Sequence, residues 1–204
     1  MADVSGLRGT ALLDALDHAD LTGLDVNTVA DALDPRELGR VDFRRLLDTL
    51  VRLSEQAPAF SLTKVDPTRF ATLVSRASRA QLEAVVASPA LRARVLDEIF
   101  ARMGSHIRRD RALDAVIHWR LSGGTGPGGY DRYATAISGG SCTVSRVTEG
   151  RPRVTVTLSP VDFFRLITHQ ATPAVLFVTG KIKVKGDLAF AAGLIGHFDL
   201  PKPS

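Results

Sequence analysis

The chain has 204 residues, of which 45% are hydrophobic, and its 26 basic and 22 acidic side chains give a net charge of +4. Folding a chain of this length buries roughly 70% of the surface that the unfolded chain exposes, so its stability needs neither disulfides nor a structural metal. The composition therefore excludes a disulfide-stapled mini-protein and a wholly disordered chain. The single cysteine, Cys142, excludes an internal disulfide.

The sequence predicts no export signal and no membrane span. The first residues lack the basic stretch and apolar core of a secretory signal. The longest apolar stretches, residues 174–178 and 188–195, fall well short of the roughly 20 residues that a membrane-spanning helix needs. We therefore expect a cytoplasmic protein.

The charges are unevenly distributed along the chain. Residues 1–48 contain ten acidic and five basic side chains, whereas residues 64–120 contain eleven basic and six acidic ones. The basic residues of the second region are mostly arginines interleaved with acidic residues, which is typical of solvated helix faces. They are accompanied by no RNP or zinc-finger pattern, so we expect no nucleic-acid partner.

The first half of the chain predicts helices. Its apolar residues recur every three or four positions, which indicates one buried stripe per helix. Asp-Pro and Ser-Pro pairs and a Ser-x-x-Gln capping box at Ser78 mark several helix starts. The predicted helices cover residues 7–21, 26–33 and 41–53, and three more begin at residues 67, 79 and 89. We interpret residues 1–62 as an acidic helical head and residues 63–90 as connecting helices.

After residue 111 the apolar period changes from about 3.6 to 2, which predicts strands. The expected strands are 115–121, 130–137, 142–147, 153–158 and 181–185, and helices are expected to begin at residues 160, 173 and 188. Strands followed by helices predict an α+β fold, in which an antiparallel sheet of about five strands is covered on one face by helices and preceded by an all-helical region. The glycine-rich run at 123–129 is interpreted as a hairpin loop, because it lacks the ending of a P-loop and is followed by a strand.

One C-terminal pattern is more specific. Residues 159–191 contain SxxDFxxL followed by TPAxxFxxGKIKVKGDLAxA. This pattern resembles the sterol carrier protein 2 (SCP2) family of lipid-binding domains, and the resemblance extends more loosely back to residue 95. It covers about half of the chain and leaves out residues 1–90. The sequence departs from the family pattern near His169-Gln170, where the family has a glycine.

The resemblance implies that residues 91–204 form an SCP2-like lipid-binding domain. Such a domain has a hydrophobic tunnel between its sheet and its C-terminal helices, which holds a fatty acid, a fatty acyl-CoA or a sterol-like ligand. Each buried methylene contributes about 0.8 kcal/mol, so a long acyl chain binds without polar recognition. From the residues alone, ordinary core packing is the alternative. The candidate lipid-binding residues are Ile117, Trp119, Phe163, Phe164, Ile167, Leu176, Phe177, Ile182, Val184, Leu188, Ala191, Leu194 and Ile195.

Three lysines form a basic stripe along one predicted strand: Lys181, Lys183 and Lys185. They are candidates for binding an anionic headgroup or a CoA phosphate, and for transient attraction to an anionic membrane surface, where each charge contributes up to ~1 kcal/mol. The alternative is a solvated sheet edge whose charges discourage pairing with another strand.

The sequence predicts no catalytic residues, no metal site and no cofactor. Its five histidines are scattered singly, and no nucleophile or metal-binding motif accompanies them. We therefore expect a soluble, non-enzymatic protein that binds or transfers a lipid. The alternative is a protein-interaction or oligomerisation module, in which the SCP2-like domain is a scaffold and residues 1–62 recruit a protein partner or form a homodimer.

Overall fold

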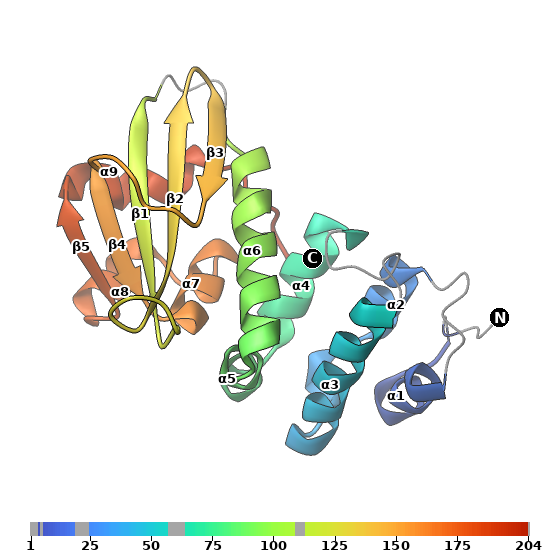
Figure 1. The fold of residues 1–204 in the computed structure, drawn as a ribbon. Coiled ribbons are helices and arrows are strands. Elements are labelled where there is room, and N and C mark those ends of the chain that lie inside the picture. Colours follow the sequence, from blue (N-terminus) through green and yellow to red (C-terminus); the bar gives the residue numbers. More distant parts are fainter. Residues whose placement is uncertain (1–3, 5, 19–24, 57–63, 109–112, 204) are drawn as a thin grey trace. The chain divides into compact units, whose positions relative to one another are not determined.

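The computed structural model describes residues 4, 6–18, 25–56, 64–108 and 113–203 (Figure 1). The chain divides into two compact units, one formed by Met1–Glu98 with Pro201–Ser204 and the other by Ile99–Leu200. This division falls inside one helix, a few residues after the boundary at residue 91 that the sequence suggests. Within the described residues, no helix is long and apolar enough to cross a membrane.

The first unit is helical, as predicted. Its helices start where the sequence places caps: the Asp66 carboxylate accepts from the N–H groups of Thr68 and Arg69, and the capping box between Ser78 and Gln81 is formed. The last residues of the predicted helix 7–21, residues 19–21, lie outside the described residues. The elements are α1 (Gly9–His18), α2 (Val26–Ala32), the 3-10 helix η1 (Pro35–Glu37), α3 (Arg40–Gln56), α4 (Pro67–Arg76), α5 (Arg79–Ala87) and the first turns of α6 (Pro89–Ser105).

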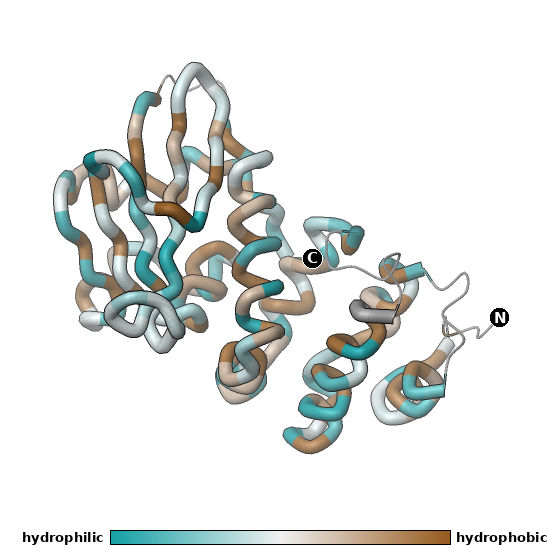
Figure 2. The backbone as a smooth tube through the Cα atoms, viewed as in Figure 1, coloured by the Kyte–Doolittle hydropathy of each residue, from teal (hydrophilic) through white to brown (hydrophobic). Residues whose placement is uncertain are grey.

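The core of this unit is rich in leucine. Leu12, Leu13 and Leu16 of α1 are fully buried in one cluster with apolar side chains of α3, along which hydrophobic and hydrophilic residues alternate (Figure 2). Polar groups at the edge of the cluster hold the same two helices together. Asp17 of α1 accepts from the Thr49 hydroxyl at 2.6 Å and from Arg45 Nε at 2.7 Å. These contacts, the Thr49 hydrogen bond above all, lower the pKa of Asp17.

The second unit is an α+β fold, also as predicted. Its five-stranded sheet has the order β3-β2-β1-β4-β5, and its helices cover one face (Figure 1). The strands are β1 (Ala115–Ser122), β2 (Tyr130–Ser138), β3 (Ser141–Ser145), β4 (Val154–Leu158) and β5 (Ile182–Gly186). The elements on the covered face are the last turns of α6, α7 (Pro160–Ile167), α8 (Pro173–Val178), α9 (Leu188–Gly193) and the 3-10 helix η3 (Leu194–His197).

The prediction of an antiparallel sheet was wrong for one strand pair. β1 and β4 are parallel, with Ile117 beside Val154, whereas the other three pairs are antiparallel. After β3 the segment 146–153 crosses the face opposite the helices (Figure 1), where the Glu149 carbonyl lies 3.3 Å from His118 Nε2. This crossing places β4 on the edge of β1 that β2 does not occupy, and β4 therefore runs in the same direction as β1. Alternation of apolar residues fixes which face a side chain occupies but not the direction of a strand.

Four aromatic rings form the centre of the second core. The Phe100 ring of α6 stacks on Tyr133 at 4.0 Å and on Phe163 at 5.0 Å between ring centroids. It meets Trp119 edge-on at 5.8 Å. Because all four side chains are essentially inaccessible, this cluster fixes α6 and α7 against the central strands.

Replacing Gly186 by alanine is expected to destabilise the second unit by about 3 kcal/mol. Its φ is +111°, and a Cβ at this position would lie 2.4 Å from the Arg153 carbonyl oxygen. Gly180 also has a positive φ, +68°, but a Cβ there would meet nothing within 4 Å. Gly180→Ala should therefore cost only about 1 kcal/mol. Urea unfolding followed by the fluorescence of the single tryptophan measures both, and equal costs would contradict this account.

Asp34→Asn is expected to destabilise the first unit by about 1 kcal/mol near neutral pH. Asp34 accepts from Arg36 at 2.6 Å and lies 3.5 Å from Arg76, and the hydrogen bond from the Arg36 side chain is the main cause that lowers its pKa from 3.8 to about 2. Since the carboxylate is favoured in the folded state, its contribution is present above about pH 4 and disappears as the pH falls toward 2.

The loss of helical circular dichroism in urea at several pH values measures this difference. Asp31→Asn removes the ion pair between Arg69 and a more exposed carboxylate, and it serves as the control with an expected cost below about 0.5 kcal/mol. An Asp34→Asn penalty that stays constant down to pH 2 would contradict the assignment.

Candidate functional site

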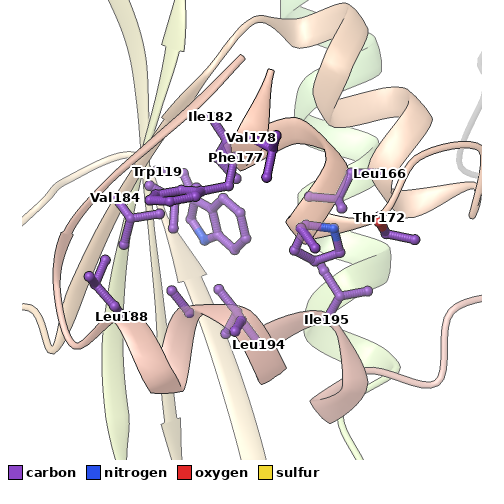
Figure 3. Close-up of a pocket in the computed structure, with 15 residues that line it drawn as sticks. Trp119, Leu166, Thr172, Phe177, Val178, Ile182, Val184, Leu188, Leu194 and Ile195 are labelled. Carbon is purple, nitrogen blue, oxygen red and sulfur yellow. The ribbon is translucent and has the colours of Figure 1, made fainter. Parts of the chain in front are cut away.

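A cavity of about 410 Å³ lies between the covered face of the sheet and the C-terminal helices (Figure 3). It lies wholly within the second unit. Strands β1, β4 and β5 form one wall, and α7, α8, α9 and η3 form the other. The lining residues are Trp119, Val156, Leu166, Thr172, Pro173, Ala174, Phe177, Val178, Ile182, Val184, Leu188, Ala191, Ala192, Leu194 and Ile195.

The sheet wall follows from strand alternation. On β5, Ile182 and Val184 face the cavity, whereas the intervening lysine faces the opposite side. Val184 lies beside Val156 of β4, which in turn lies beside Trp119 of β1. Three adjacent strands therefore present a continuous apolar row to the cavity.

Two short capped helices form the opposite wall. Helix α8 begins at Pro173 and is capped by Thr172, whose side chain accepts from the Val175 N–H. Helix α9 begins at Leu188 and is capped by Asp187, whose carboxylate accepts from the Phe190 N–H at 2.9 Å. That hydrogen bond is the main cause that lowers the pKa of Asp187, and an ion pair with Arg153 at 2.9 Å adds to it. The ion pair ties the start of α9 to the start of β4.

The lining offers apolar contact almost exclusively. Among the described lining residues, Thr172 carries the one hydroxyl group, and it serves as a helix cap. The Trp119 Nε1–H donates to Thr135 Oγ1 at 3.1 Å, so the polar edge of the indole is satisfied inside the sheet. The cavity therefore suits an apolar ligand that requires no directional hydrogen bond.

The cavity reaches the surface beside α8 and the start of α9. Phe177, Val178 and Leu188 line it and are nevertheless 55%, 85% and 56% exposed. In Figure 3, Phe177 and Val178 lie across the cavity from Leu188, so the exposed side chains flank its opening. The opening of the cavity therefore lies between these two helices.

The cavity brings together eight of the thirteen predicted lipid-binding residues. They are Trp119, Phe177, Ile182, Val184, Leu188, Ala191, Leu194 and Ile195. The other five are buried without lining it and serve as core: Ile117, Phe163, Phe164, Ile167 and Leu176. Phe163, for example, is part of the aromatic cluster.

Sequence reasoning missed seven lining residues: Val156, Leu166, Thr172, Pro173, Ala174, Val178 and Ala192. Val156 could have been found, because it alternates with threonines on a predicted strand and its face is that of Val154 and Leu158. Ala174 and Ala192 could not have been found in this way, because no sequence pattern marks an alanine that contributes to a cavity through its small size.

The three predicted headgroup lysines do not line the cavity. Lys183 and Lys185 are exposed on the opposite face of β5, which is an edge strand of the sheet, and Lys181 directly precedes that strand. Their position fits the alternative of a charged, solvated sheet edge.

His169 lies at the end of α7 with φ of +60°, a conformation that glycine adopts more readily. The Gln170 N–H closes the helix by donating to the Arg165 carbonyl at 2.8 Å. The chain thus keeps the left-handed helix ending near the place where the family pattern has glycine. Within the described part of the chain, no group of three or more His, Cys, Asp or Glu side chains could hold a metal ion.

One of the comparisons with known proteins identifies a family. The model of the SCP-2 sterol transfer family matches residues 96–199. A comparison with curated proteins gave no match.

Three solved structures illustrate the structural similarity. The ubiquinone synthesis protein UbiJ-SCP2 is 18% identical over 53% of this chain and 96% of its own, with a TM-score of 0.43. Palmitated SCP2L2 from Aedes aegypti is 20% identical over 54% of this chain and 96% of its own, with a TM-score of 0.41. The inverting sec-alkylsulfatase Pisa1 from Pseudomonas sp. is 15% identical with a TM-score of 0.47, and the match covers 98% of this chain but 31% of the sulfatase.

The family match spans just over half of the chain and nearly coincides with the second unit, which contains the sheet, the covering helices and the apolar cavity. The chain therefore belongs to the SCP-2 sterol transfer family.

Proposed function

We propose that this chain binds one lipid molecule in the apolar cavity of its second unit and carries it without changing it chemically. The observation that carries the proposal is the cavity of about 410 Å³ with an almost wholly apolar lining. Its volume lies in the range of small-molecule sites, about 300–1,000 Å³. The compartment expected from the sequence, the cytoplasm, is part of the proposal.

The volume favours a ligand with a single acyl chain. At about 30 Å³ for each water-sized group, the cavity holds on the order of 14 such groups. Burial of ten methylenes contributes roughly 8 kcal/mol, which offsets the several kcal/mol lost when a flexible molecule is immobilised. A fatty acid or the acyl part of a fatty acyl-CoA would fill the cavity, and a sterol-like ligand is the bulkier alternative.

The polar end of the ligand would remain near the opening. Thr172, the hydroxyl-bearing residue of the lining, lies at the exposed start of α8. The described lining contributes no titratable side chain, which supports binding rather than acid–base chemistry. Recovery of an unchanged acyl-CoA after incubation, measured by mass spectrometry, tests whether the ligand is carried without chemical change. Selection among lipids would depend on the size of their apolar part.

Trp119 gives a direct test of ligand location, because it is the single tryptophan of the chain and lines the cavity. A fatty acid brominated along its chain should quench its fluorescence in a saturable way, and an excess of unlabelled fatty acid should restore it. Bromine near the middle of the acyl chain should quench more than bromine beside the carboxylate. If neither quenching nor a co-purifying lipid is found, the proposal is wrong.

Ala191→Phe is expected to weaken fatty-acid binding at least about tenfold, because it places a ring in the space that the acyl chain would occupy. The stability of the fold should change by less than about 1.5 kcal/mol, since the ring enters existing space. The matched control is Ala189→Phe on the same helix, where the side chain is exposed and does not line the cavity. Equal weakening by both variants would show that the ligand binds elsewhere.

A further inference from the structure

The face of the sheet opposite the helices carries charge of one sign. Side chains of a strand alternate between its two faces, so the neighbours of the buried Trp119 on β1, which are His118 and Arg120, lie on this outer face. By the same alternation and the strand register, the outward positions of the five described strands contain four basic side chains and no acidic one. The four basic residues are Arg120, Arg132, Lys183 and Lys185.

Three of these four lie in one row across the sheet. Arg120 is directly opposite Arg132 of β2 on one side and Thr157 of β4 on the other. Thr157 in turn is directly opposite Lys183 of β5. We name these four residues the outer row. Since neighbouring strands lie about 5 Å apart, the outer row presents three positive charges and one hydroxyl group within a span of about 15 Å.

The outer row lies between two loops that do not cover it. The crossing segment 146–153 passes over the adjacent row, where His118 is buried and its Nε2 lies 3.3 Å from a carbonyl of the segment (Figure 1). On the other side is the hairpin loop 123–129, one of whose carbonyls accepts from Arg132 Nη2 at 2.9 Å. The loops therefore border the outer row and leave its centre exposed.

The packing of the sheet does not explain Arg120. Like charges directly opposite each other on neighbouring strands destabilise a sheet, and Arg120 faces Arg132 in this way. Charges on an edge strand discourage pairing with another strand, which accounts for the lysines of β5, but β1 is the central strand. Arg120 and Lys183 are exposed, and among the described residues neither has a hydrogen bond or an ion pair. Both charges are therefore available to a partner.

The chemistry of the outer row favours an acidic polypeptide as that partner. A second copy of this face would bring charges of the same sign together. None of the exposed large hydrophobic side chains of the described residues belongs to a strand, so the row offers a bilayer no apolar contact. Single-stranded nucleic acids require exposed aromatic rings, whereas the outward Tyr130 is half-buried beside Gly128 of the hairpin loop. Carboxylates accept charge-assisted hydrogen bonds from guanidinium and ammonium groups.

We propose that the outer row binds an acidic segment of a protein partner, whose carboxylates accept hydrogen bonds from Arg120, Lys183 and the Thr157 hydroxyl. The row lies on the opposite face of the sheet from the cavity, so a partner and a cavity ligand can be bound at the same time. The inference therefore goes beyond the proposed lipid binding and does not depend on it.

The test uses the full chain and the fluorescence anisotropy of a labelled oligoglutamate peptide, with an oligoglutamine peptide of the same length as the neutral control. The oligoglutamate should bind at low ionic strength and be released in high salt, because salt screens exposed charges. Arg120→Gln and Lys183→Gln should each weaken its binding about fivefold. The matched control is Lys64→Gln, which removes an exposed positive charge from the first unit and should leave binding unchanged.

Two further measurements separate binding from folding and from the cavity. Arg120→Gln should not lower the urea midpoint of the second unit, because it relieves the repulsion from Arg132. Quenching of Trp119 by a brominated fatty acid should be the same in the parent chain, Arg120→Gln and Lys183→Gln. Equal weakening by Lys64→Gln would reveal a nonspecific attraction and overturn the proposal. Tighter binding of a DNA duplex or of anionic vesicles than of oligoglutamate, lost in Arg120→Gln, would overturn the assignment to a protein partner.

Discussion

The second unit depends on the need to cover one apolar face of a five-stranded sheet. That need is met differently along the sheet. Over the central strands, α6 and α7 supply Phe100 and Phe163, whose rings pack closely with those of Tyr133 and Trp119. Over β4 and β5 the cover consists of α8 and α9, each of six residues, and of η3. The cavity lies under this weaker cover.

An unfilled apolar cavity is energetically expensive. At about 24 cal/mol for each Å³, a sealed cavity of this size would cost ~10 kcal/mol, which is comparable to the whole stability of a typical domain. The opening beside Phe177 and Leu188 reduces that cost, because the space is accessible and does not have to remain empty. The surrounding frame prevents collapse: the aromatic cluster holds one side, and the Arg153–Asp187 ion pair with the close approach of Gly186 to Arg153 holds the other. A bound lipid would recover the contacts that the cavity lacks.

The sequence predicted those features that neighbouring residues determine. Helix starts were predictable because caps such as Asp66 and Ser78 act on backbone groups two or three residues away. The inward position of Ile182 and Val184 was predictable because the side chains of a strand alternate. The direction of β4 was not predictable, since it depends on the path of segment 146–153 across the sheet.

The division between core and cavity was also beyond the sequence. Phe163 and Leu166 lie on the same helix and are equally buried, but Phe163 packs in the aromatic cluster and Leu166 lines the cavity. Their apolar chemistry is the same, and the difference arises from what lies opposite each side chain in the folded unit. The lysine stripe illustrates the same limit, because its alternation with Ile182 and Val184 was plain in the sequence, whereas its place at the sheet edge required the strand order.

Selectivity in such a site must arise from volume rather than from hydrogen bonds. The Trp119 indole already donates to Thr135, so it demands no partner from a ligand. The Thr172 hydroxyl, which accepts from the Val175 N–H, is the one hydroxyl group of the described lining. A site of this kind does not reject a ligand for lacking a hydroxyl or an amide. It selects instead by the length and width of the ligand's apolar part. The space available to that part is set where the lining side chains are small, at Ala174, Ala191 and Ala192. For the proposed lipid ligand, the smallest side chains of the cavity would therefore determine which lipid fits.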